Sequence, residues 1–404
     1  TANITVDAQG RITAAANGTG GGATSLNGLS DAKTTDSGAA DESIFIGTDS
    51  GSSNTSGNRN VAIGYKALED ANVDDSVVIG SGAAKDATAS CAESVVIGSQ
   101  AGQKDGPNRA VFVGYRAGQE CTVPNNTCVG HDAGQFMTTG DSNTFVGLNA
   151  GQGNSTDKMT GDDNVGIGFA ALGDLTSGNG NTTVGFYAGT DITNGVYNVF
   201  LGYDAGRYAA TIDRCVFIGY RTGGGNVSRT GDDNIAIGKD ALYGYTTGEK
   251  NTCIGYEAAD ALTTGSNNTA LGNGATPSSN TVSNEITLGD SNIATLRCNV
   301  QTISSLSDAR DKTDVQELPE GLAFIDRLNP VKFKWQTRDG NGRDGTYEAG
   351  FIAQELQSAQ TEADADYLGL VMDENPDRLE ASYGKLVPML VKAIQELKSE
   401  VEQL

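Results

Sequence analysis

The stretch Asn164-Val165-Gly166-Ile167-Gly168 decides the fold of most of this chain, because close variants of it recur along the sequence. Asn60-Val61-Ala62-Ile63-Gly64 and Asn234-Ile235-Ala236-Ile237-Gly238 are two of these variants. The terminal Gly recurs, mostly 16 to 18 residues apart, at positions 47, 64, 80, 98, 114, 130, 147, 168, 185, 202, 219, 238, 255, 272 and 289. Each unit predicts one short strand, one tight corner and a polar return.

One such unit cannot bury an apolar face by itself, so successive units must stack as coils around a shared core. The alternation of Val61 with Ile63, and of Ile235 with Ile237, predicts that these side chains form the buried face. We therefore expect residues 40–290 to form a β-solenoid of about 17 residues per coil.

An Asn stands four residues before the repeat Gly in many units. Its positions are 60, 126, 143, 164, 181, 198, 234, 251 and 268. These side chains either form an internal hydrogen-bonded ladder or each shape their own turn, and the sequence favours neither interpretation.

The repeats of residues 40–290 resemble the head repeats of trimeric bacterial adhesins, which form β-rolls and also occur in phage fibres. Upstream, residues 4–13 read as strand, turn, strand and resemble a unit of phage fibres. We expect residues 1–39 to be a β fibre unit with a connector, and residues 291–306 to be a neck.

The charge of the chain limits its partners. It has 404 residues with 27 basic and 51 acidic side chains, a formal net charge of −24, and no Lys/Arg cluster. Nucleic acid and anionic lipid are therefore not expected partners. No apolar run reaches the length of a membrane span, and residues 1–4 do not begin a signal peptide, so neither membrane insertion nor standard export is expected.

Few residues of the repeats invite a chemical role. The six Cys occur singly, which predicts reduced, buried side chains and assembly in a reducing cytoplasm. The turns 161–164 and 231–234 are rich in Asp and Asn, but plain turns are favoured over calcium sites. The only His, His131, is interpreted as structural. Neither a metal nor a cofactor is expected.

Aromatic residues follow the repeat Gly in seven coils, and packing is favoured over a stripe for stacking sugars. They are Tyr65, Tyr115, Phe169, Phe186, Tyr203, Tyr220 and Tyr256.

From residue 303 onward Gly becomes rarer and the pattern is that of a small α+β domain, expected over residues 307–384. Residues 319–328 and 350–356 predict helices, and residues 331–335 and 367–372 predict strands. Residues 385–404 predict a coiled-coil helix, because apolar side chains step by 3 and 4. The seam residues are Val387, Leu390, Ile394, Leu397, Val401 and Leu404.

Four motifs in this region occur in the order of one known family. They are residues 306–312 (LSDARDK), 329–333 (NPVKF), 350–355 (GFIAQE), and 386–388 (LVP) with 393–397 (AIQEL). Residues 303–404 resemble the endosialidase-type intramolecular chaperone, a serine peptidase family that trimerises, nucleates folding of the fibre before it and then cuts itself off.

The resemblance implies a self-cleavage site. It places the cut between Leu306 and Ser307, with Ser307 and Lys312 as a Ser/Lys dyad that acts once per chain; Ser307 would attack the Leu306 carbonyl either through an N-to-O acyl shift or as part of this dyad. Asp308 and Arg310 lie between them as possible supports. A Lys that accepts the Ser proton must be neutral, which requires burial or a nearby cation such as Arg310.

Together these features predict a mostly β protein: a trimeric β-solenoid or β-roll fibre, then a small α+β chaperone domain ending in a coiled coil. The expected function is a phage tail fibre for host attachment, assembled in the host cytoplasm and carried on the virion tail. Its expected partners are two further copies, tail or baseplate proteins, and a host receptor or polysaccharide. The alternatives are a secreted trimeric adhesin, or a fibre that also depolymerises polysaccharide.

Overall fold

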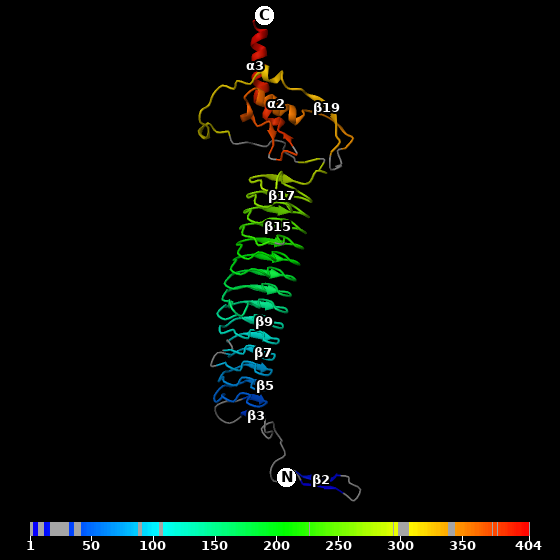
Figure 1. Cartoon of the computed structure of the whole chain (residues 1–404). Helices are drawn as coiled ribbons and strands as arrows, with labels where there is room; N and C mark the ends of the chain where they lie inside the picture. Colours follow the sequence, from blue (N-terminus) through cyan, green and yellow to red (C-terminus); the bar gives the residue numbers. More distant parts are fainter. Residues whose placement is uncertain are drawn as a thin grey trace. The chain divides into compact units, whose positions relative to one another are not determined.

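The computed structural model describes residues 42–87, 91–104, 108–225, 227–293, 295–297, 307–337, 344–373, 375–377 and 379–403, and the backbone of three earlier strands. These strands are β1 (Asn3–Val6), β2 (Ile12–Ala16) and β3 (Ala32–Thr35). The chain divides into two compact units (Figure 1). The first is Thr1–Ala275 with Ser283–Thr287, and the second is Thr276–Val282 with Leu288–Leu404.

The upstream strand pair is confirmed, because β1 and β2 pair antiparallel with Asn3 opposite Ala16. The first unit is otherwise built on one 16-stranded sheet in which β3 to β18 follow each other in chain order. From β4 (Ser43–Ile46) to β17 (Thr269–Leu271) each strand pairs in parallel with the next (Figure 1).

The strands between them are β5 (Val61–Ile63), β6 (Val77–Ile79), β7 (Val95–Ile97), β8 (Val111–Val113), β9 (Thr127–Val129), β10 (Thr144–Val146), β11 (Val165–Ile167), β12 (Thr182–Val184), β13 (Val199–Leu201), β14 (Val216–Ile218), β15 (Ile235–Ile237) and β16 (Thr252–Ile254). The last is β18 (Ile286–Leu288). Residues aligned on the repeat Gly lie above one another, so the predicted β-solenoid is confirmed, with about 14 turns.

The prediction of which strand face is buried is wrong. Ala62 and Ala236 are fully buried, whereas Val61 and Ile63 are only partly covered and Ile235 is 38% exposed. Side chains alternate along a strand, so a Val-Ala-Ile triplet can turn either face inward, and hydrophobicity alone misassigns it. The narrow interior takes the central residue, and the two flanking residues point outward.

The interior is filled by matching the size of this central residue to the residue six positions later. Where the centre is Phe112, the later residue is Gly118, and a Cβ there would lie 2.6 Å from the Phe112 ring. Where the centre is Ala62 or Ala236, the later residue is a fully buried Leu, Leu68 or Leu242. The total side-chain volume in these coils is thereby kept within what the coil can hold.

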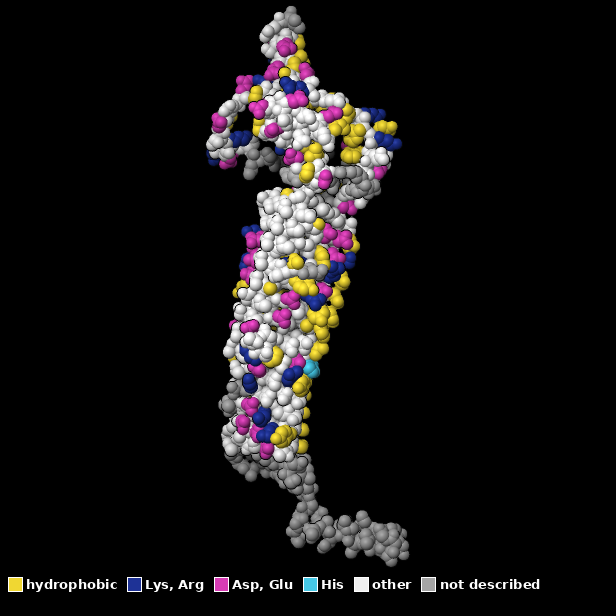
Figure 2. Space-filling model, in the orientation of Figure 1, with side chains coloured by type: hydrophobic (Ala, Val, Ile, Leu, Met, Phe, Trp, Pro, Cys, Tyr) yellow, Lys and Arg dark blue, Asp and Glu magenta, His cyan; other side chains and the backbone are white. Residues whose placement is uncertain are grey.

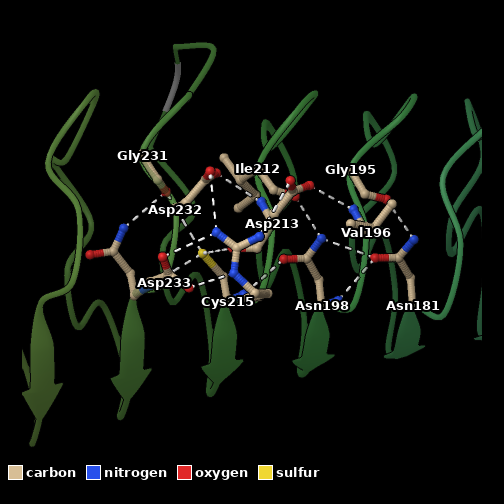
Figure 3. Close-up of polar contacts among 12 residues, drawn as sticks. Asn181, Gly195, Val196, Asn198, Ile212, Asp213, Cys215, Gly231, Asp232 and Asp233 are labelled. Carbon is tan, nitrogen blue, oxygen red and sulfur yellow. Dashed lines mark hydrogen bonds and ion pairs between the residues drawn. The ribbon is translucent and has the colours of Figure 1, made fainter.

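The Asn residues form a ladder inside the solenoid (Figure 3). Asn181 donates from Nδ2 to Asn164 Oδ1 at 3.0 Å and to the Gly195 carbonyl at 2.8 Å. Its own Oδ1 accepts from the backbone N–H of Asn198 at 3.1 Å, and Asn198 does the same for Cys215 at 2.9 Å. Buried backbone groups are thus satisfied from coil to coil, which decides between the two interpretations of Asn.

The five cysteines within the described residues are free and buried: Cys91, Cys121, Cys128, Cys215 and Cys253. Burial raises the pKa of the Cys253 thiol to about 12, so it stays protonated and packs as a small apolar group. These five agree with the prediction; Cys298 lies outside the described residues.

The second unit has the predicted α+β character. Its elements are η2 (Ala309–Asp311), α1 (Leu322–Ile325), β19 (Val331–Lys334), β20 (Tyr347–Gly350), α2 (Ala353–Glu362), η3 (Asp366–Leu368), β21 (Val371–Met372), β22 (Glu380–Ala381), η4 (Tyr383–Leu386) and α3 (Val387–Val401). Strands β19 and β20 pair antiparallel, as do β21 and β22. Every helix among the described residues is too short or too polar to span a lipid bilayer.

Two predicted elements of this unit differ from the structure. The helix predicted over 319–328 is only four residues long, and the strand predicted over 367–372 begins as the 3₁₀ turn η3. Gly369 ends that turn with φ of +56°, so only Val371–Met372 remain extended. Phe324, Ala365, Leu370, Leu386 and Met389 form the buried core, so these segments are fixed by packing rather than by their own periodicity.

The size matching inside the coils can be tested by exchanging one pair for another. Phe112→Ala should lower the free energy of unfolding by about 3–5 kcal/mol per chain, because it leaves a cavity. Gly118→Leu alone should also destabilise, because Leu overfills the coil against the Phe112 ring. The double variant recreates the Ala236–Leu242 arrangement and should recover most of the denaturation midpoint in guanidinium. A double variant no more stable than Phe112→Ala would contradict the matching.

Candidate functional site

Ser307 and Lys312 are brought together by the turn η2. Asp308 begins this turn, and its Oδ1 accepts from the backbone N–H of Arg310 at 2.9 Å. The backbone N–H of Lys312 donates to the Ala309 carbonyl at 3.3 Å, which returns the chain towards Ser307. Lys312 Nζ consequently lies 2.6 Å from Ser307 Oγ, within hydrogen-bond distance.

The two residues expected to support the pair are occupied with each other. Arg310 Nη2 lies 2.6 Å from Asp308 Oδ2, and its Nε lies 3.1 Å from both carboxylate oxygens. Hydrogen bonding to Arg310 lowers the pKa of the Asp308 carboxyl, and the same contact raises the pKa of Arg310. Asp308 thus stabilises the turn. Its carboxylate also neutralises the positive charge of Arg310, which was expected to favour the neutral form of Lys312.

The Ser307–Lys312 pair is open to solvent in the single chain. Ser307, Lys312 and every residue from 313 to 317 are exposed, and the apolar Val315 is 79% exposed. In this geometry Lys312 donates to Ser307, whereas a general base must accept the hydroxyl proton as a neutral amine. Leu306 lies outside the described residues, so the roles of Leu306, Ser307 and Lys312 stay predictions.

Helix α3 has two different faces. Leu386, at its N-terminal boundary, and Met389 and Ala393 are buried against the second unit. The predicted seam lies on the neighbouring face, about a quarter-turn around the helix, and is uncovered, with exposed fractions of 56% for Val387 and 66% for Ile394. The seam residues Leu390, Leu397 and Val401 are also exposed, and so is Val391, which the heptad pattern did not include. Leu404 lies outside the described residues.

Comparison with family models assigns residues 307–365 of the second unit. Residues 307–365 match the model described as chaperone of endosialidase, and the match begins at Ser307. The chain carries a chaperone-of-endosialidase domain. Neither a curated protein nor a solved structure matches the chain. The assignment of this chaperone domain, expected from four short motifs, is confirmed.

The fibre that precedes the chaperone domain has an uncharged surface, here called the outer strand face. It consists of the first and third residues of the strands β5 to β18. Every one of these residues is Val, Ile, Leu or Thr, although the chain as a whole has 78 charged side chains. Ile167, Val184 and Ile254 are 38%, 38% and 39% exposed, and hydrophobic side chains gather along one side of the first unit (Figure 2).

Four of the seven aromatic residues predicted to line up, Phe169, Phe186, Tyr203 and Tyr220, form a stacked column that follows strands β11 to β14. The ring centroids of Phe169 and Phe186 lie 4.9 Å apart, those of Phe186 and Tyr203 5.2 Å, and those of Tyr203 and Tyr220 5.3 Å. The planes are within 17° of parallel, so neighbouring rings cover each other's faces. Sugars stack on ring faces, and only edges remain free inside this column, which agrees with the favoured interpretation of packing.

The other singled-out repeat residues have contacts within the fibre. His131 lies 5.0 Å from the Tyr115 ring, and its Nδ1 lies 3.1 Å from Asp132 Oδ2. Asp232 accepts from the Asp213 backbone N–H at 2.9 Å and lies 3.7 Å from the Arg214 guanidinium (Figure 3). Its carboxylate is thus used to join successive coils.

Proposed function

We propose that this chain forms a trimeric fibre whose chaperone domain assembles three copies and then detaches itself by cutting between Leu306 and Ser307. The observation that carries the proposal is the outer strand face, an uncharged apolar surface that continues from coil to coil. A chain with a net charge of −24 repels its own copies elsewhere on its surface, so close association requires an uncharged face.

The outer strand face approaches the size of a standard protein interface. Three residues per strand at about 3.3 Å, over the 14 strands from β5 to β18 at about 4.8 Å spacing, give roughly 670 Å² of sheet. A standard protein interface buries about 800 Å² on each partner. The neighbouring aromatic column would widen the contact. Packing of this face against other copies would remove its Val and Ile side chains from water.

The α3 seam supplies a second contact between copies. A coiled coil through the seam holds three chain ends together and raises their effective concentration before the solenoids meet. Val or Ile at one seam position with Leu at the next leans towards two strands in peptides, but three heptads specify the number weakly. The fibre and the chaperone family both favour three.

The cut itself uses only groups at the start of the chaperone domain. Ser307 Oγ attacks the Leu306 carbonyl, Lys312 accepts the hydroxyl proton and returns it to the departing Ser307 amine, and an ester replaces the peptide bond. Water then hydrolyses the ester, which restores the hydroxyl and leaves a carboxylate on Leu306. Loss of the assembly nucleus makes the fibre slow to unfold, which is kinetic stability.

We further propose that the released fibre attaches a phage tail to its host. A long, repetitive, β-rich shaft behind an assembly domain suits a structure that must project and resist denaturation. Its partners would be tail or baseplate proteins at one end and a host receptor or polysaccharide. Purified fibre should bind host cells and compete with phage for adsorption. A secreted adhesin would instead be found on the surface of the bacterium that makes it.

The dyad assignment predicts that Ser307→Ala and Lys312→Ala each give an uncut chain that still forms trimers, because neither substitution touches the outer strand face or the α3 seam. The uncut trimer should resist denaturant less than the released fibre. Mass spectrometry of protein made without other proteases reports the fragment 307–404, and the exposed Ser358→Ala is the matched control. Cutting at the same bond in Ser307→Ala would mean that the nucleophile is wrong.

The outer strand face predicts where charge blocks assembly. Ile167→Lys with Val184→Lys places two charges on adjacent coils of this face and should reduce the trimer, while the single chain tolerates them because both positions are 38% exposed. The control is Ser177→Lys with Asn194→Lys, two exposed positions on the polar return of adjacent coils. Light scattering measures the mass. Equal trimer in both variants would refute the interface.

Charges in the α3 seam are expected to prevent folding of the fibre as well as its assembly. Leu390→Asp with Leu397→Asp puts six carboxylates into a three-chain seam, so chains cannot be gathered before the solenoid associates. We expect the fibre to be recovered from cells unfolded or aggregated. Recovery of normal trimer from this variant would remove the chaperone role.

A further inference from the structure

The segment that follows the Ser307–Lys312 pair contacts the folded core of the second unit only from Glu317 onward, among the residues that the structure describes. Residues 312–317 are exposed, and the first side chain that packs on the buried core is Leu318. Fixing the segment near Glu317 therefore limits how far the pair can move away from the domain. Reaction rates fall steeply when reacting groups are loosely placed.

Helix α3 fixes this segment through two side chains one turn apart. Lys392 pairs with Glu317, and its Nζ lies 3.8 Å from Glu396 on the same helix. Glu396 Oε2 accepts from the backbone N–H of Leu322 at 2.7 Å, at the first residue of α1. The same helix that offers the apolar seam thus holds the chain leading to the Ser307–Lys312 pair.

The Glu396 contact requires glycine at position 321. A Cβ on Gly321 would lie 2.1 Å from Glu396 Oε2, far inside van der Waals contact. Because the obstructing atom is the end of a flexible side chain, Ala at this position would displace the carboxylate rather than the backbone. Gly321 therefore offers a way to break the contact without altering α3.

We infer that Lys392 and Glu396 are positioning residues that make self-cleavage depend on assembly. This rests on the self-cleavage proposed above. Beyond Ala393, α3 buries no side chain in the single chain, and a short unpacked helical segment is marginally stable in water, so covering the apolar seam with two further copies would hold this half of the helix in place. Through the contacts of Lys392 with Glu317 and of Glu396 with Leu322, a fixed α3 would also fix residues 317–322. The Ser307–Lys312 pair, which precedes them in the chain, would then move less.

The test measures the rate of cutting per trimer in full-length chains made by cell-free synthesis. Lys392→Met and Glu317→Gln should each slow cutting about two- to fivefold, the range expected for one exposed ion pair. Because both remove the same contact, the double variant should be no slower than the slower single variant. Lys392→Arg should cut normally. Raising the salt concentration should slow the wild type towards the Lys392→Met rate without slowing Lys392→Met.

The contact of Glu396 with the Leu322 N–H gives an independent test of the same inference. Gly321→Ala should slow cutting by a similar factor, whereas Glu396→Gln keeps an acceptor for the Leu322 N–H and should stay close to wild type. Lys398→Met removes another Lys–Glu pair of α3, 3.6 Å long and remote from the Ser307–Lys312 segment, and is the matched control.

The outcomes separate this inference from the proposed function. Unchanged cutting per trimer in Lys392→Met and Gly321→Ala overturns the positioning role, and so does a loss of cutting that only follows a loss of trimer. Multiplicative slowing in the Lys392→Met, Glu317→Gln double variant overturns it as well. Cutting in Ser307→Ala would instead overturn the self-cleavage mechanism, whatever the α3 variants do.

Discussion

The close stacking of one glycine column sets the geometry of the fibre. At Gly185 the backbone has a φ of +146°, and a Cβ there would lie 2.3 Å from the carbonyl oxygen of Gly202 in the next coil. An L side chain is excluded both by the dihedral angle and by the neighbouring backbone. Since the same corner recurs in the coils from Gly47 to Gly255, strands stay in register, and residues of one type form continuous columns inside and outside the solenoid.

Polar and apolar columns stabilise the solenoid in different ways. Inside, the Asn ladder satisfies backbone groups that water cannot reach, and the paired sizes of residues such as Phe112 and Gly118 keep each coil filled. Outside, the flanking strand residues create an apolar face that a single chain leaves partly uncovered. A fold that is complete within one chain therefore still leaves an apolar face, which the proposed trimer would cover.

In the chaperone domain, helix α3 likewise has one buried face and one exposed apolar face. The buried residues Met389 and Ala393 attach α3 to its own domain, and the seam residues leave an apolar surface exposed in the single chain. Lys392 and Glu396 join the attached side to the segment that leads from the Ser307–Lys312 pair. The proposed coupling of assembly to cleavage is possible because α3 carries both the exposed apolar seam and the contacts to Glu317 and Leu322.

Much of this protein was determined by its sequence alone. The period of the repeat Gly fixed a solenoid, since only stacking can bury the face of so short a unit. The motifs around Ser307 and Lys312 fixed the chaperone domain, and their five-residue spacing suits a single turn that returns Lys312 to Ser307. The stepping of Val387 and Leu390 predicted a helix with an apolar stripe, which α3 has; the coiled coil itself stays a prediction. These are local patterns, which a chain expresses through its own periodicity.

Tertiary structure decided which face of each strand is buried, because Val61, Ala62 and Ile63 are all apolar and alternate equally well in either phase. A sequence signal did exist: the residue six positions after the strand centre is Gly when the centre is Phe112 and Leu when it is Ala62. Only three-dimensional packing gives that pattern its meaning. The contacts of Glu317 with Lys392 and of Leu322 with Glu396 join residues 75 and 74 positions apart, and no local periodicity encodes them. Their partners become neighbours only when Leu318, Phe324 and Met389 collapse into one core.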